Sequence, residues 1–187
     1  MASDSSVIGS SVVPFRLVFL MWAAFYLELM LGLPLSLFGI TPRTLPGLIG
    51  IFTAPLIHGD ILHLISNTIP MLFLGVVLFF FYAPIGGQVF FRAYFWTNIL
   101  VWLFARPANH IGASGVVYAL AFFLIFFGLL RRDFLSIFIS LVVLILYGGV
   151  FYGVLPPDSR VSWESHFAGA LVGIGSAITF SRKKKVS

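Results

Sequence analysis

The clearest candidate for chemistry in this sequence is a serine set among small residues. Ser114 lies in the segment Gly112-Ala113-Ser114-Gly115, at the start of an apolar stretch. The glycines allow a sharp turn and close approach of a ligand, and a helix that begins here directs free N–H groups and its positive dipole end toward the hydroxyl. This arrangement suits a nucleophile beside part of an oxyanion site. Small residues are equally typical of close helix packing, so the segment alone leaves both interpretations open.

A histidine in the last apolar stretch is the candidate base. His166 shares one helix face with Gly169 and Gly173, and the G-x-x-x-G spacing permits very close approach to another helix. If that helix is the one that begins at Ser114, the two side chains lie at similar depth. A neutral imidazole then accepts the hydroxyl proton near pH 7. The alternative is a histidine that only stabilises the bundle by a hydrogen bond between helices.

Three further side chains could support such a pair. Tyr118 lies one turn after Ser114 on the same face, where it could pack against the imidazole, although aromatic residues make up 17% of the chain. His63 and Asn67 are four residues apart, so on a helix they present hydrogen-bond donors on one face. That face predicts either an inward polar pocket or a polar clamp between helices.

The composition indicates that these residues are positioned by a membrane protein. Apolar residues make up 60% of the 187 residues, charged residues 9%, and the mean hydropathy is +1.08. This leaves too little polar surface for a soluble enzyme, a disordered chain or a nucleic-acid binder. The net charge is +5, but four of the eleven cations lie in the tail at 182–185, as expected for a membrane-surface flank. The chain has no cysteine, which excludes disulfides and thiolate metal sites.

Apolar stretches separated by proline, glycine or charged residues predict an all-α bundle that crosses the membrane six times. A spanning helix needs about 20 residues. The fourth stretch has only 16 residues (115–130), so Ser114 is expected below the membrane surface, with the preceding loop dipping toward it. Irregular backbone at that depth is tolerated only where it lines a wet or protein-walled cavity. The six predicted spans are 17–38, 61–81, 88–104, 115–130, 134–155 and 163–180.

The distribution of cations predicts both termini in the cytoplasm. With that orientation eight Lys and Arg residues lie inside and three outside, in agreement with the positive-inside rule. The predicted organisation is a disordered N-terminal lead-in at 1–14, one membrane domain at 15–180, and a basic cytoplasmic tail at 181–187.

The three motifs together resemble the rhomboid family of intramembrane serine proteases. The resemblance covers residues 15–180 and is specific as a combination, although each motif alone is weak. The matching positions fall in order on the second, fourth and sixth predicted spans or just before them: His58, His63, Asn67, Gly112, Ser114, Gly115, Tyr118, His166, Gly169 and Gly173.

The resemblance implies a role for each motif. Ser114 would be the nucleophile and His166 the general base and later the acid, while the Ser114 N–H, His63 and Asn67 would stabilise the oxyanion. His58 would shape the loop on the substrate side. The implied fold is a six-helix rhomboid-like bundle, and the implied activity is hydrolysis of peptide bonds in or near transmembrane segments.

A Ser–His dyad without a carboxylate is predicted. Glu164 is only two residues before His166, about 200° around a helix, and so faces away from the same partner. Orientation of the ring would then come from packing, such as that of Tyr118. One departure from the family is the first loop, 39–55, which reads Thr41-Pro42-Arg43 where relatives commonly have a Trp-Arg pair. The six acidic residues are Asp4, Glu28, Asp60, Asp133, Asp158 and Glu164.

The expected partners are single-span or polytopic membrane protein substrates and the lipid bilayer, with no nucleic acid, cofactor or metal. A prokaryotic plasma membrane is the expected location. Two alternatives are a catalytically silent rhomboid-like binder, whose known relatives typically lack the serine or histidine, and a small transporter, which the absence of repeated halves disfavours. The sequence assigns no role to Glu28 or His110 and does not identify the substrate or the oligomeric state.

Overall fold

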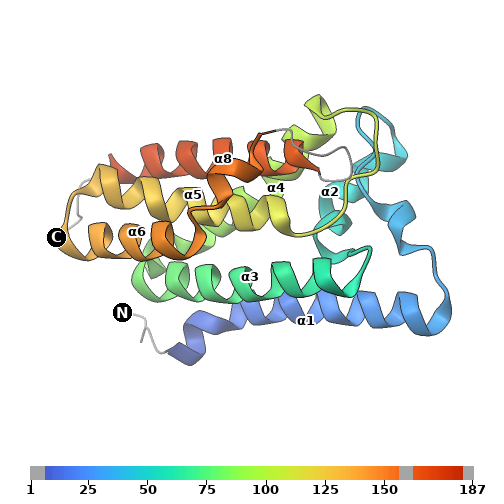
Figure 1. Ribbon diagram of the computed structural model, residues 1–187, viewed down its shortest axis with the longest axis horizontal. Helices are drawn as coiled ribbons and strands as arrows, with labels where there is room; N and C mark the ends of the chain where they lie inside the picture. The colour runs from blue at the N-terminus through green and yellow to red at the C-terminus, as the bar shows by residue number, and fades with distance from the viewer. Residues whose placement is uncertain (1–6, 156–161, 183–187) are drawn as a thin grey trace.

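The computed structural model describes residues 7–155 and 162–182, which form an all-helical bundle (Figure 1). This part of the chain confirms the predicted all-α class. The short segments lie in the first loop: η1 (Leu35–Phe38), η2 (Pro46–Leu48), α2 (Gly50–Thr53) and η3 (Ala54–Leu56). The long helices are α1 (Val7–Leu31), α3 (Ile61–Phe81), α4 (Ala83–Phe104), α5 (Ser114–Arg131), α6 (Phe134–Tyr147) and α8 (Trp163–Ser181), with the short α7 (Val150–Gly153) between the last two.

Helix α1 begins about ten residues before the start of the predicted first span. Residues 7–14, predicted as part of a disordered lead-in, are helical, and 1–6 lie outside the described residues. Tertiary packing explains the early start, because the ring of Pro14 fills the space that a Cβ on Gly75 of α3 would occupy, 2.6 Å away. The helix ends before Gly32, whose φ of +63° suits a left-handed C-terminal cap, and Pro34 prevents its continuation.

Two other predicted boundaries differ from the structure. Helix α4 begins at Ala83 instead of residue 88, because a proline at position 84 is tolerated in the first turn of a helix. The predicted fifth span, 134–155, is interrupted after Tyr147 by Gly148 and Gly149, and each glycine costs a helix about 1 kcal/mol relative to alanine. The remaining predicted spans agree with α3, α5 and α8 to within one residue at each end.

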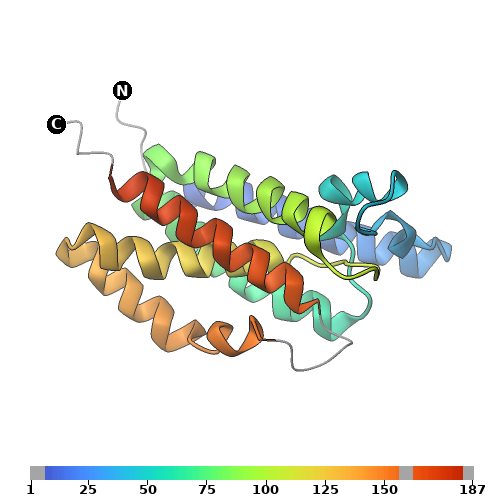
Figure 2. The same cartoon turned by 90° about the horizontal axis from the view of Figure 1, so that it is seen from above.

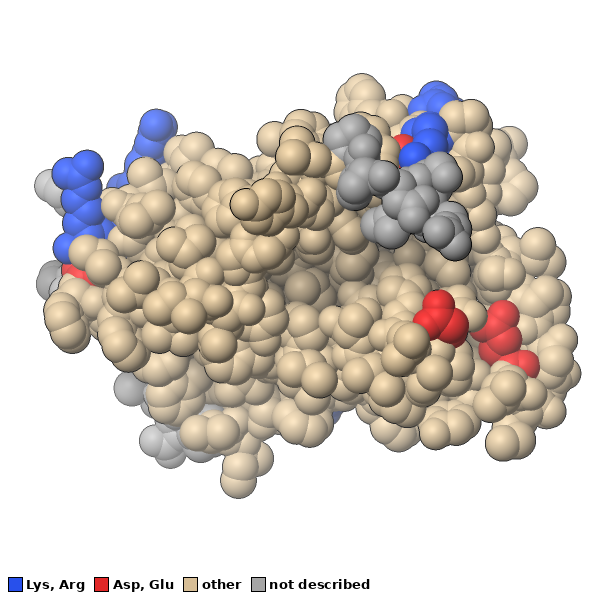
Figure 3. Space-filling view, in the orientation of Figure 1, with Lys and Arg blue, Asp and Glu red and all other residues tan. Residues whose placement is uncertain are grey.

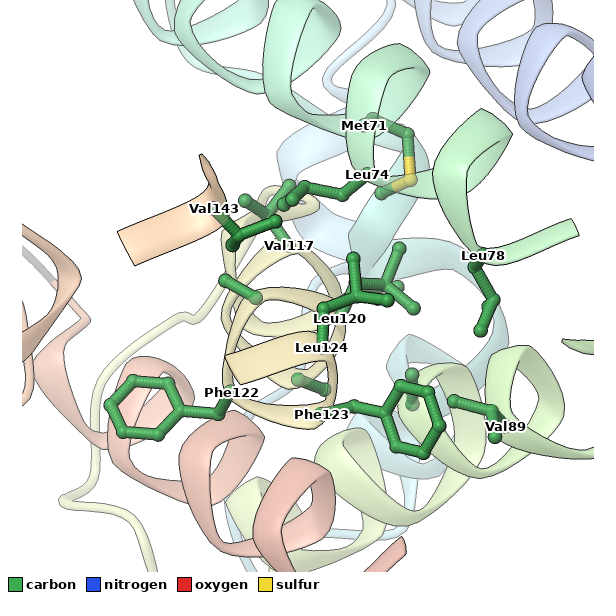
Figure 4. Packing of buried hydrophobic residues seen from close by; sticks show 14 of the residues in the cluster. Met71, Leu74, Leu78, Val89, Val117, Leu120, Phe122, Phe123, Leu124 and Val143 are labelled. Carbon is green, nitrogen blue, oxygen red and sulfur yellow. The ribbon is translucent and has the colours of Figure 1, made fainter. Parts of the chain in front are cut away.

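Helix α5 is the centre of the core. Its Leu120, Phe123 and Leu124 are fully buried. Figure 4 shows these side chains packed between Leu74 of α3 and Val89 of α4. A helix buried on most of its circumference has little freedom to move, so its first residue, Ser114, starts from a rigid support.

Helix α8 packs against α5 through glycine. A Cβ on Gly169 would collide with the carbonyl oxygen of Gly115, and a Cβ on Gly173 would collide with that of Ala119. Figure 2 shows α8 crossing α5. The predicted G-x-x-x-G face of α8 therefore meets α5, which carries Ser114.

The first loop is ordered by contacts with the end of α4 and the loop that follows it (105–113). The guanidinium of Arg43 donates to the carbonyl oxygens of Leu103 at 3.2 Å and Ala105 at 2.8 Å, which caps the C-terminal end of α4. The Trp102 indole donates to the carbonyl of Thr44 at 2.9 Å. Although this loop lacks the Trp-Arg pair, these contacts give it a defined structure.

Within the described ranges 7–155 and 162–182, three helices, α1, α3 and α5, are long and apolar enough to cross a bilayer by themselves. The first turn of α1 and the last turn of α8 lie at the same end of the bundle (Figures 1 and 2). Charged side chains gather near the two ends of the face shown in Figure 3, and the surface between them is uncharged. This distribution fits a membrane protein, while the six crossings stay a prediction.

Candidate active site

A cavity of about 690 Å³ opens between α3, α5 and α8. Figure 3 shows a hollow on this side of the molecule. The loop 105–113 forms one wall, and the first residue of α5 lies in the lining, as expected for a loop that dips toward a polar recess. The polar side chains in the lining are Asp60, His63, Ser66, Asn67, Arg106, Asn109, His110, Ser114, Tyr118, Tyr147, Ser162 and His166.

Ser114 and His166 meet in this cavity. The Ser114 Oγ lies 3.0 Å from Nε2 of His166, although the two residues are 52 positions apart. Both side chains are half-buried, so they are shielded by the bundle but reachable from the cavity. The separation is within hydrogen-bond reach, which is the geometry that proton transfer from a hydroxyl to an imidazole requires.

The other ring nitrogen of His166 determines how this pair works. Nδ1 lies 2.9 Å from the carbonyl oxygen of Gly153 in α7. A carbonyl oxygen can only accept a hydrogen bond, so Nδ1 carries the proton and Nε2 presents its lone pair to Ser114. The Gly153 carbonyl therefore selects the tautomer in which His166 can act as a base, a task that a carboxylate performs in Ser-His-Asp hydrolases.

Tyr118 fixes the plane of the imidazole. Its ring stacks on that of His166 with centroids 4.0 Å apart and an angle of 4° between the planes. The same phenol occupies the space beside Gly153 where a Cβ would otherwise lie. Ring orientation at His166 thus comes from one stacked aromatic side chain and one backbone carbonyl.

His63 and Asn67 of α3 lie across the cavity from the start of α5. The His63 ring approaches the backbone at Gly112 so closely that a Cβ there would lie 2.7 Å from Nε2, and Gly112 has a φ of +103°. The positive φ favours glycine at this position, and a larger residue would also displace the His63 ring. The buried Asn67 amide donates one hydrogen to the carbonyl of His63 at 2.8 Å and has a second hydrogen to offer. The first N–H groups of α5, starting with that of Ser114, have no partner within the helix.

His58 supports the loop that leads to Ser114. It is 1% exposed, its ring packs edge-on against that of His63 at 5.0 Å, and its Nε2 accepts a hydrogen bond from the N–H of Ala113 at 3.4 Å. The Nδ1 lies 3.4 Å from the carbonyl of Leu56. Burial lowers the pKa of His58 from 6.5 to about 4, with a smaller contribution from neighbouring His63. The imidazole is thus held neutral, as acceptance from Ala113 requires.

The lowered pKa of His58 predicts a loss of stability in mild acid. His58 takes up a proton near pH 6.5 in the unfolded chain and only near pH 4 in the folded chain. The stability that neutral His58 contributes to the folded state is therefore complete above pH 6.5 and is lost as the pH falls toward 4. Between pH 7 and pH 5 the free energy of unfolding should fall by about 2 kcal/mol from this residue. Denaturation in detergent at both pH values measures it. His58→Gln, whose side-chain oxygen can still accept from Ala113, should show a smaller decrease, and an equal decrease would contradict the assignment.

Charged residues lie around the site and form no part of the Ser114–His166 pair. Glu164 forms an ion pair with Arg106 across 3.3 Å, which links the start of α8 to the loop 105–113. Glu28 lies three residues before the end of α1 and is half-buried. Within residues 7–155 and 162–182 no group of three or more metal-ligating acidic or histidine side chains is found.

Sequence reasoning missed two contributors to the site, the Gly153 carbonyl and the Ser162 side chain. The Gly153 carbonyl is a backbone group, and no side-chain motif marks it. Ser162 forms a hydrogen bond of 2.6 Å with His110, a residue whose place in the dipping loop had made it a candidate for the cavity wall without a role.

Known proteins resemble this chain over most of its length. A family model described as the rhomboid domain matches residues 46–183. "Uncharacterized protein Rv1337" of Mycobacterium tuberculosis is 34% identical over 188 residues, which cover 95% of this chain and 77% of the relative. "Uncharacterized protein ML1171" of Mycobacterium leprae is 35% identical over 153 residues, which cover 73% of this chain and 57% of the relative. Together with its three membrane-length apolar helices, these matches identify an integral membrane protein. The chain belongs to the rhomboid family, as its motifs predicted.

Proposed function

We propose that this protein is an intramembrane serine endopeptidase that hydrolyses peptide bonds in or near transmembrane segments of membrane proteins. Ser114 is the nucleophile and His166 the general base. The observation that carries the proposal is the 3.0 Å separation between the Ser114 Oγ and Nε2 of His166. The other ring nitrogen, Nδ1, is hydrogen-bonded to the carbonyl of Gly153. Membership of a family of intramembrane proteases supports it.

The reaction begins when the Ser114 oxygen attacks the substrate carbonyl carbon and His166 Nε2 accepts the hydroxyl proton. The carbonyl oxygen becomes negatively charged, and the N–H of Ser114 with the side chains of His63 and Asn67 would stabilise that charge. Each well-placed donor of this kind contributes about 3–4 kcal/mol in other enzymes. The C–N bond then breaks, and His166 returns the proton to the leaving amine. Water entering from the cavity hydrolyses the acyl-enzyme by the same sequence of transfers.

The site would accept a peptide only in an unwound form, because a continuous helix keeps its carbonyl groups hydrogen-bonded. The substrates in this proposal are therefore single-span or polytopic membrane proteins whose helix opens locally. The protein would cross a prokaryotic plasma membrane six times, with the domain at 15–180 and both termini in the cytoplasm. Mycobacterial relatives support a bacterial setting.

The test uses the purified full chain in detergent. We expect it to cleave a model single-span substrate and to take up a fluorophosphonate, which reacts with activated serines. Mass spectrometry of the products and of the intact protein measures both. Cleavage and labelling that persist in Ser114→Ala would refute the nucleophile, while failure to cleave any suitable substrate or to take up the probe would favour a binding function.

Asn67→Ala should slow turnover by about 100-fold while fluorophosphonate labelling continues, because it removes one donor to the oxyanion and leaves the nucleophile and base in place. Steady-state kcat on the model substrate measures this effect. Ser66→Ala is the control, because the Ser66 hydroxyl also donates to the carbonyl of His63 and Ser66 also lies in the cavity wall. Equal turnover in Asn67→Ala and the wild type would remove Asn67 from the oxyanion site.

A further inference from the structure

His110 occupies a junction beside the proposed catalytic pair. It is four residues before Ser114 and is 2% exposed. Its Nε2 lies 3.1 Å from the carbonyl oxygen of Arg106, and its Nδ1 lies 2.6 Å from the hydroxyl of Ser162. Because the carbonyl can only accept, a neutral ring donates from Nε2 and accepts from Ser162 at Nδ1. Both ring nitrogens are therefore used.

Ser162 lies four residues before His166, just as His110 lies four residues before Ser114. The carbonyl oxygen of Ser162 accepts a hydrogen bond from the His166 N–H at 3.4 Å. Ser162 is also the N-cap residue of α8, yet its hydroxyl makes no capping bond. It bonds instead to His110 and to the Ser165 hydroxyl, each at 2.6 Å. A serine at this position usually caps its helix, so its hydroxyl serves a tertiary contact here.

The backbone of His110 is held independently of its ring. Its N–H donates to the carbonyl of Ile40 at 2.9 Å, and its carbonyl accepts from the Ile40 N–H at 2.9 Å. This isolated bridge ties the loop 105–113 to the first loop. On the other side, the carbonyl of Ser165 lies 3.0 Å from where a Cβ on Gly115 would be. His110 thus joins the first loop, the loop 105–113 and the first turn of α8.

We propose that His110 is a positioning residue, which through Ser162 fixes the start of α8 against the loop that carries Ser114. The contact lies about one helical turn, or about 6 Å, beyond the Ser114–His166 hydrogen bond. A displacement of about 1 Å between reacting groups can cost about 100-fold in rate, so a clamp at this point has a large effect on turnover. The inference rests on the proposed function, because it assigns His110 a role in that reaction.

Two substitutions at His110 separate its two hydrogen bonds. In His110→Asn the side-chain oxygen lies near the position of Nδ1 and can still accept from Ser162. In His110→Gln the amide reaches toward the carbonyl of Arg106 instead, and the bond to Ser162 is lost. Ser162→Ala removes the same bond from the other side. We expect His110→Gln and Ser162→Ala each to lower kcat about tenfold with KM unchanged, and His110→Asn to stay within about twofold of the wild type.

The double variant His110→Gln with Ser162→Ala should be no slower than either single variant, since both remove one shared interaction. Additive losses would contradict a clamp, as would equal losses in His110→Asn and His110→Gln. Equal kcat in all variants and the wild type would overturn the proposal while leaving the proteolytic function intact. Melting temperatures measured alongside distinguish unfolding from misplacement, because misplacement lowers kcat without lowering the melting temperature in proportion.

A spectroscopic readout tests the clamp without reference to cleavage. The chain has four histidines, so nitrogen-15 labelling of their rings gives four sets of signals that substitutions can assign. In the wild type, His110 should show a protonated Nε2 and an accepting Nδ1. In Ser162→Ala the Nδ1 signal of His110 should shift, and so should the Nε2 signal of His166. Unchanged His166 signals would overturn the positioning role, whereas absence of cleavage with these shifts present would refute only the proposed function.

Discussion

His166→Ala is expected to abolish substrate cleavage and to lower fluorophosphonate labelling of Ser114 to background. Without the imidazole the Ser114 Oγ loses the nitrogen placed to accept its proton, because His166 Nε2 is hydrogen-bonded to it. Loss of the base in a well-studied serine protease costs about 10⁶ in kcat. Intact-protein mass spectrometry and kcat on a model substrate measure the two effects. Ser114→Ala should give the same loss, and the double variant should be no worse.

The matched control for His166→Ala is a histidine that is buried nearby but has another task. His58→Gln keeps an acceptor for the Ala113 N–H, so it should retain labelling. Labelling of His166→Ala at the wild-type rate would show that the serine is activated by some other group, and the dyad would have to be abandoned.

Gly169→Ala is expected to lower both stability and labelling, through the packing of α8 on α5. The added methyl group would collide with the carbonyl oxygen of Gly115 and lie 3.1 Å from the N–H nitrogen of Ala119. Forcing an extra carbon into such an interface costs about 1–3 kcal/mol in the free energy of unfolding. The helices must also separate, which moves His166 away from Ser114 and should slow labelling by about 100-fold.

The control for this prediction is Gly175→Ala in the same helix. A Cβ on Gly175 meets no atom within 4 Å, and alanine favours a helix over glycine by about 1 kcal/mol. This variant should label at the wild-type rate and be at least as stable. Denaturation curves and labelling rates for the two alanine variants therefore provide a direct comparison. Equal behaviour of the two would contradict the close packing of α5 and α8.

The sequence predicted those features that depend on local spacing. The serine between small residues and the glycine stripe after His166 predicted a close approach of two helices, and the structure places α8 on α5 through Gly169 and Gly173. The stacking of Tyr118 on His166 follows from its position one turn after Ser114, since residues four apart lie on one face. Membership of the rhomboid family was predicted from the same motifs.

Features that depend on tertiary contacts were not predictable in this way. Residues 7–14 are helical as part of α1, which packs on α3 where Gly75 makes room for Pro14, a partner 61 positions away. The break after Tyr147 frees α7 to present the Gly153 carbonyl to His166, and nothing in the side-chain pattern marks a carbonyl as a partner. The His110–Ser162 bond likewise joins residues 52 positions apart.

The most direct test of the central claim is the site of fluorophosphonate attachment in the wild-type protein. Peptide mapping by mass spectrometry after labelling in detergent should find one modified residue, Ser114, and the modification should disappear in His166→Ala. Attachment to a different serine, or an unmodified Ser114 in folded protein that cleaves its substrate, would contradict the account.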